Sequence, residues 1–137
     1  MPGKMHNRRM AKSSSEDKRL TRLTKIALAL PEAKRELHGS HATFLIRKKP
    51  FAYFLDNHHG DGIVGFTCRV LPGENSALVA AQPERFYPPA YLASRGWVAL
   101  RLDRDKIDWE EVKELLLSSY TLIAPRRLAE QVVSEID

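Results

Sequence analysis

The sequence lacks the residues that several protein classes need. It has one cysteine, Cys68, among 137 residues, which excludes an intramolecular disulfide and a cysteine-rich zinc site. No apolar run reaches the roughly 18–20 residues of a membrane-spanning helix. No apolar stretch follows the basic N-terminus, which argues against a secretory signal. We therefore expect a cytoplasmic protein that makes no use of a membrane.

Recognisable catalytic signatures are also missing. The glycines match neither of the nucleotide-binding fingerprints. Ser118, Ser119 and Tyr120 have no histidine or acid at a spacing typical of a nucleophile and its base. Cys68 falls in the inward-facing set of a predicted strand, so we expect a buried, inert thiol. The sequence predicts a binding module that is not an enzyme and has no cofactor.

The positive charge is unevenly distributed. The chain has 22 basic and 17 acidic residues, a net charge of +5, and its first 19 residues contribute +4 of it. A basic surplus is normally a sign of nucleic-acid binding, but here it says little about the folded body. Residues 1–14, which include Arg8 and Arg9, lack periodicity and are predicted to form a disordered basic arm. Residues 15–137 are then a single domain.

The first predicted helix follows this arm. Ser13 or Ser14, each followed by an acid three residues later, is the predicted N-cap. Apolar residues then repeat at helical spacing at Leu20, Leu23, Ile26, Ala27 and Leu30. Pro31 disfavours helical geometry at the residue before it, so the helix should end near Leu30.

Strand-like segments come next. Residues 42–47 and 51–56 flank Lys48-Lys49-Pro50, a short connection typical of a hairpin. In residues 63–70 and 97–102 every second side chain is apolar, which is typical of half-buried strands. A short helix is predicted over residues 75–82 between them. The inward-facing sets of the two strands are Val64, Phe66, Cys68 and Val70, and Val98, Leu100 and Leu102.

The C-terminal part is predicted to be helical. Asp108, with Glu111 three residues later, begins one helix, and Pro125 suits the first turn of another. The order of a helix, several antiparallel strands and further helices predicts a two-layer α+β sandwich. Its helices should pack on one face of the sheet.

Three motifs resemble the MmcQ/YjbR family. The segment LALPEAKRELHGSHATFLIRKKPFAYF has that family's spacing of helix, proline and hairpin. Gly96-Trp97-Val98 with Leu100-Arg101-Leu102, and then SSYTLI at residues 118–123, resemble its C-terminal half. The likeness covers about residues 18–133. It implies a frataxin-like (CyaY-like) fold and DNA binding through a double-wing motif, and brings no catalytic residues.

Two groups of residues are candidate DNA contacts. Arg47, Lys48 and Lys49 at the hairpin tip could reach phosphates as a wing, or could be a solvated turn that protects a sheet edge. Arg69, Trp97 and Arg101 share an outer face if their strands are neighbours, which suits stacking and phosphate contacts. Such a tryptophan is more often covered by a loop or a partner subunit.

Metal binding is not expected. The histidines and nearby acids match no helical pair of metal ligands, and a HHGDG run is ordinary turn chemistry; they are His38, His41, Asp56, His58, His59 and Asp61. The first helix is basic, through Lys18, Arg19, Arg22 and Lys25, which argues against iron. Acids from Asp103 to Glu114 place a negative field at one end of the domain, so DNA should meet the other end.

These observations leave three hypotheses. The leading one is a non-enzymatic domain that binds DNA weakly through the hairpin wing, helped by the arm. The alternative is a protein-interaction or regulatory domain that uses the sheet face around Trp97. A third is an enzyme whose pocket is lined by Tyr53, Tyr87, Tyr91 and Trp97. The oligomeric state stays open.

Overall fold

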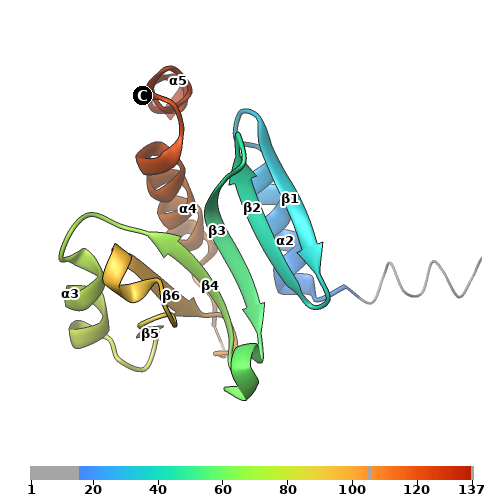
Figure 1. The fold of residues 1–137 in the computed structure, drawn as a ribbon, viewed down its shortest axis with the longest axis vertical. Coiled ribbons are helices and arrows are strands. Elements are labelled where there is room, and N and C mark those ends of the chain that lie inside the picture. Colours follow the sequence, from blue (N-terminus) through green and yellow to red (C-terminus); the bar gives the residue numbers. More distant parts are fainter. Residues whose placement is uncertain (1–15, 105, 137) are drawn as a thin grey trace, which may run out of the picture.

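In the computed structural model, which describes residues 16–104 and 106–136, one antiparallel sheet forms the centre of the fold (Figure 1). Its strand order is β1-β2-β3-β4-β6-β5. The strands are β1 (Ala33–His38), β2 (His41–Ile46), β3 (Lys49–Asp56), β4 (Val64–Arg69), β5 (Phe86–Tyr87) and β6 (Trp97–Arg101). Consecutive strands along the chain are neighbours from β1 to β4, as expected for a series of hairpins.

Two helices, α2 and α4, form the second layer of the fold. The helices of the described residues are α2 (Lys18–Leu28), α3 (Glu74–Ala81), α4 (Trp109–Ile123) and α5 (Arg126–Ile136). Helix α2 packs on β1 and β2, α4 packs on β3 and β4, and α3 lies beside β5 and β6 (Figure 1). The predicted α+β sandwich is therefore confirmed. Among the described residues, every helix is too short or too polar to span a bilayer.

Alternation along the strands builds the core. Phe44, Phe54 and Phe66 are fully buried on the face that also meets Leu23 of α2 and Leu116 of α4. The inward sets predicted for β4 and β6 are confirmed, since Phe66, Cys68, Val70, Val98, Leu100 and Leu102 are buried and half-buried Val64 packs against the same core. Burial of these apolar side chains is the main stabilising contribution to the fold.

The β2–β3 hairpin has a tighter turn than its sequence indicates. The turn residues are Arg47 and Lys48, both with positive φ (47° and 69°), while Lys49 and Pro50 already belong to β3. A two-residue turn of this type matches the right-handed twist of the flanking strands. A shift in register between Phe44 and Leu45 accompanies Pro50, which has no N–H for a regular ladder.

An aspartate is the N-cap of both α2 and α4. Ser13 and Ser14 lie outside the described residues, and the N-cap of α2 is instead Asp17, whose carboxylate accepts a hydrogen bond from the Arg19 N–H at 2.8 Å. The positive end of the helix dipole also stabilises a negatively charged side chain at this position. At α4 the prediction is confirmed, since the Asp108 carboxylate accepts from the N–H groups of Glu110 and Glu111.

Candidate binding site at one end of the sheet

The predicted wing lies at the tip of the β2–β3 hairpin. Arg47 is tied to Glu32 by two hydrogen bonds of 3.0 and 3.1 Å, and this guanidinium lowers the pKa of the Glu32 carboxyl. Lys48 and Lys49 are exposed, and within the described part of the chain neither forms an ion pair. Two of the three predicted cations are therefore free to meet an anion.

The second predicted group is only partly brought together. Arg69 and Trp97 are direct cross-strand partners on β4 and β6, but Arg101 is four residues further along β6. Arg101 makes two hydrogen bonds to Asp103, at 2.9 and 3.0 Å, which lower the pKa of that carboxyl. Trp97 is only 8% exposed. Within the part of the chain that the structure describes, the group offers one guanidinium without an ion pair, that of Arg69, and its tryptophan is buried.

Three of the aromatic side chains considered for an enzyme pocket, Tyr53, Tyr87 and Trp97, lie on the sheet face opposite Cys68, and Tyr91 lies in the loop between β5 and β6. The Tyr53 ring lies 5.6 Å from the Trp97 ring. The Tyr87 hydroxyl lies against Gly65, and burial raises the pKa of Tyr87 to about 12. Tyr91 is exposed, with its ring 6.2 Å from that of His59.

The histidines cluster at the end of the sheet that carries the η1 turn (His58–Gly60). The His58 ring lies 5.5 Å from His41 and 3.9 Å from His59. Within residues 16–104 and 106–136, no three His, Cys, Asp or Glu side chains are grouped so as to hold a metal ion. Cys68 is buried on the other face, which raises its pKa to about 12 and keeps the thiol protonated.

A cavity of about 460 Å³ opens beside Arg69. We call it the arginine pocket, because Arg69 from the end of β4 and Arg95 from the η2 turn (Ala93–Arg95) both line it. Both arginines are exposed, and neither forms an ion pair among the described residues. The rest of its lining is small, polar or apolar: Val70, Pro72, Gly73, Asn75, Ser76, Ala93, Ser94, Gly96 and Leu122.

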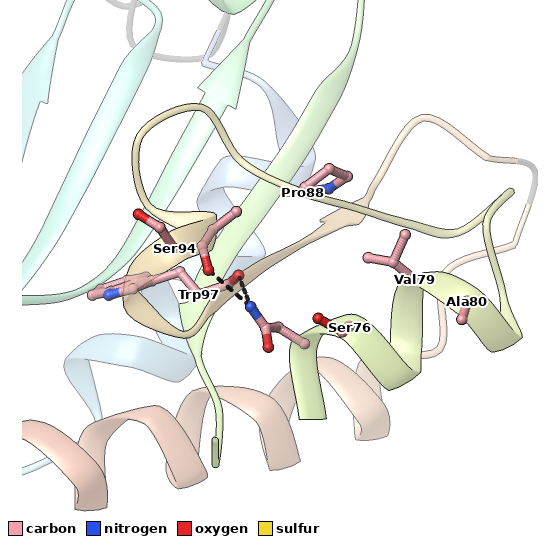
Figure 2. Close-up of a pocket in the computed structure, with 8 residues that line it drawn as sticks. Ser76, Val79, Ala80, Pro88, Ser94 and Trp97 are labelled. Carbon is pink, nitrogen blue, oxygen red and sulfur yellow. Dashed lines mark hydrogen bonds between the residues drawn. The ribbon is translucent and has the colours of Figure 1, made fainter. Parts of the chain in front are cut away.

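A second cavity of about 510 Å³ adjoins the first. We call it the apolar pocket, since Val79, Ala80 and Pro88 line it and none of the described residues in its lining is charged. The two pockets share four lining residues, Asn75, Ser76, Ala93 and Ser94. The Asn75 amide donates to the backbone oxygens of Ala93 (2.9 Å) and Trp97 (3.4 Å), the hydrogen bonds drawn as dashed lines in Figure 2, and these bonds connect α3 to the η2 turn.

Charge differs between the two ends of the sheet. Lys49 begins β3, and Asp56 ends it about 25 Å away. Arg69 lies at the Lys49 end, because Ala52 pairs with Cys68. The acids at the Asp56 end, where β6 leads into the first turn of α4, are Asp56, Asp61, Asp103, Asp108, Glu110 and Glu111. Asp103 is ion-paired with Arg101 and Glu111 with Arg85, so the other four supply the negative charge at this end. An anionic partner is therefore favoured at the Arg69 end.

Arg95 is the site residue that the sequence analysis missed. It stands in a loop, so no strand or helix periodicity marks it. The signal available was Gly96, whose φ of 90° ends the η2 turn and turns the chain into β6. Its proximity to Arg69 depends on β4–β6 pairing, which links segments 26 residues apart in sequence.

Comparisons with known proteins agree with this fold. Protein DR2400 of Deinococcus radiodurans, a DUF419 domain, has a crystal structure that is similar with a TM-score of 0.62 and 20% identity, over 81% of this chain and 85% of that one. A Pseudomonas syringae protein, Northeast Structural Genomics Consortium target PsR293, is similar with a TM-score of 0.51 and 17% identity, over 67% of this chain and 87% of that one. No match was found among curated proteins.

The family assignment rests on the sequence itself. The family model described as YjbR matches residues 28–122, which include the hairpin tip, Arg69, Arg95 and Trp97. This range lies inside the span over which the motifs resemble the MmcQ/YjbR family. The chain belongs to the YjbR family.

Proposed function

We propose that this YjbR-family chain is a non-enzymatic binding domain that contacts DNA weakly through the end of the sheet where Lys48, Lys49 and Arg69 lie. One observation carries the proposal. These cations and Arg95 are exposed at one end of the sheet, and none is ion-paired within the described residues.

The physical basis is electrostatic. Each Lys or Arg that meets a phosphate releases condensed counterions, which favours binding at low salt and carries no base specificity. The turn residue Lys48 and the adjoining Lys49 are exposed, so their ammonium groups are accessible to the DNA backbone. The acids at the opposite end of the sheet repel DNA there, so the domain has one preferred orientation. Dissociation constants of about 10⁻⁴–10⁻⁶ M are typical of such contacts.

The N-terminal arm is part of the same proposal. Arg8 and Arg9 lie outside the described residues, and the first 19 residues hold +4 of the net charge of +5. We propose that this segment adds nonspecific affinity, while the sheet end sets the orientation. The two contributions are separable, because they belong to different parts of the chain.

The test is a salt-titrated anisotropy measurement with a labelled DNA duplex. We expect the full chain to bind most tightly, and a chain starting at residue 15 to bind more weakly but measurably. If removal of residues 1–14 abolishes binding, the folded body is not a DNA reader. If neither chain binds at low salt, the protein-interaction alternative takes its place.

A further inference from the structure

We infer that the arginine pocket is a binding site for a phosphate ester, with the phosphate group between Arg69 and Arg95. This goes beyond the proposed function, because it concerns a built cavity that can act without the hairpin wing or the arm. The inference rests on the charge, rigidity and shape of the pocket.

The charge of the pocket is uncompensated within the described residues. Arg69 and Arg95 line it from two different segments, and no acidic side chain is among its lining residues. The acid nearest in sequence to this part of the lining is Glu74, whose carboxylate accepts a hydrogen bond from the Leu71 N–H at 3.3 Å. Planar guanidinium groups match the oxygens of a phosphate in paired hydrogen bonds, better than lysine ammonium groups do.

The fold fixes the walls of the pocket in advance. The Val70 N–H donates to the Gly96 oxygen at 3.1 Å, which extends the β4–β6 pairing past Arg69. The Asn75 amide holds the Ala93 oxygen at 2.9 Å, and the buried Ser119 hydroxyl accepts from the Arg69 N–H at 2.9 Å. Little backbone ordering is then left for the ligand to bring about, which favours affinity.

The shape of the pocket indicates more than a bare anion. A cavity of about 460 Å³ is in the size range of small-molecule sites and far exceeds one phosphate group. Ser76 and Ser94, whose hydroxyls can donate to phosphate oxygens, also line the apolar pocket, which Figure 2 shows with Val79 and Pro88 on its wall. In a phosphate ester with an apolar group, the phosphate would occupy the arginine pocket and the apolar group the adjoining apolar pocket.

Phenyl phosphate is a suitable probe, titrated into the ¹⁵N-labelled full chain and followed by amide chemical shifts. We expect saturable shifts at the amides of Ser76, Ser94 and Gly96. Arg69→Gln and Arg95→Gln should each weaken binding about tenfold, since each removes hydrogen bonds to a charged group. Arg104→Gln, at the opposite end of the sheet, is the matched control and should leave affinity unchanged. Melting temperatures of all three variants verify that they are folded.

Further titrations distinguish the possible sources of the phosphate group. Benzyl alcohol, which lacks the phosphate, should cause no saturable shifts at these amides. A DNA duplex that displaces phenyl phosphate identifies the source as a DNA backbone phosphate, and a duplex that does not displace it identifies a small phosphate ester. Binding that requires Arg69 and Arg95 but tolerates Lys48→Ala with Lys49→Ala supports the pocket even if DNA binding fails. Absence of these shifts, or shifts that persist in both arginine variants, overturns the inference.

Discussion

The hydroxyl of Ser119 accepts a hydrogen bond from the backbone N–H of Arg69 at 2.9 Å, across 50 residues of sequence. The same hydroxyl donates to the Phe51 oxygen at 2.6 Å. The last paired residues of β3 and β4 are Ala52 and Cys68, so Ser119 satisfies the two backbone groups that lie just beyond them. A side chain of α4 thus fixes the strand end that carries Arg69.

Ser119→Ala tests this role. The substitution leaves two backbone groups without their partner next to a fully buried position, so we expect a decrease of about 2–3 kcal/mol in the free energy of unfolding. Urea denaturation measures the decrease. Ser118→Ala, at the adjacent exposed position, should change stability by no more than about 0.5 kcal/mol. Equal effects of the two substitutions would contradict the bridging role.

Gly65 and Tyr87 offer a second test, on the sheet face opposite Cys68. A Cβ atom at residue 65 would overlap with the Tyr87 hydroxyl and would lie 3.1 Å from the Leu100 oxygen. Gly65→Ala should therefore destabilise the fold by about 1–3 kcal/mol through overpacking. In the Gly65→Ala variant, the second substitution Tyr87→Phe removes the overlapping hydroxyl and should therefore restore part of the lost stability. A Tyr87→Phe effect that is the same with Gly65 and with Ala at this position would show that the two sites do not interact.

The histidine cluster should make stability depend on pH. Burial, and then the nearby His59 and His41, lower the pKa of His58 below its ordinary value of about 6.5, against a smaller opposing effect of Asp61. Between the two values the unfolded chain binds more protons than the folded one. The contribution is therefore favourable above pH ~6.5 and disappears as the pH falls through the pKa of the folded state.

An NMR titration of the His58 ring measures this pKa directly. We expect a midpoint below the ordinary histidine value. His59→Gln removes one neighbouring ring that can become charged, so it should raise the midpoint. A midpoint at or above the ordinary value in the unsubstituted chain would be incompatible with the arrangement of these rings.

The parts of the fold that could be predicted are those with a buried face. Alternation placed Phe66 and Val98 on the core side of β4 and β6, and the charge pattern around Asp108 located the start of α4. The edge strand β1 was missed because its sequence, AKRELH, has charged residues and mostly exposed positions in place of an alternating apolar set. Strand β5 was missed because a strand of two residues, Phe86–Tyr87, is too short to show an alternation of apolar and polar side chains.

Only those parts of the candidate site that are formed by residues adjacent in sequence could be predicted. The hairpin tip follows from neighbouring residues, so Lys48 and Lys49 were found from the sequence. The salt bridge between Arg47 and Glu32, 15 residues apart, depends on the pairing of β1 with β2. The arginine pocket depends on β4–β6 pairing and on the Asn75 hydrogen bonds, which no periodicity indicates.

The salt dependence of DNA binding tests the central claim most directly. In the full chain, Lys48→Ala with Lys49→Ala should reduce the slope of log K against log salt by about 1.8, or about 0.9 for each phosphate that is no longer neutralised. Lys25→Ala with Lys113→Ala, on the exposed sides of α2 and α4, removes the same charge from the helix layer and should leave the slope unchanged. A slope that falls equally for both pairs, or for neither, would contradict DNA binding at this end of the sheet.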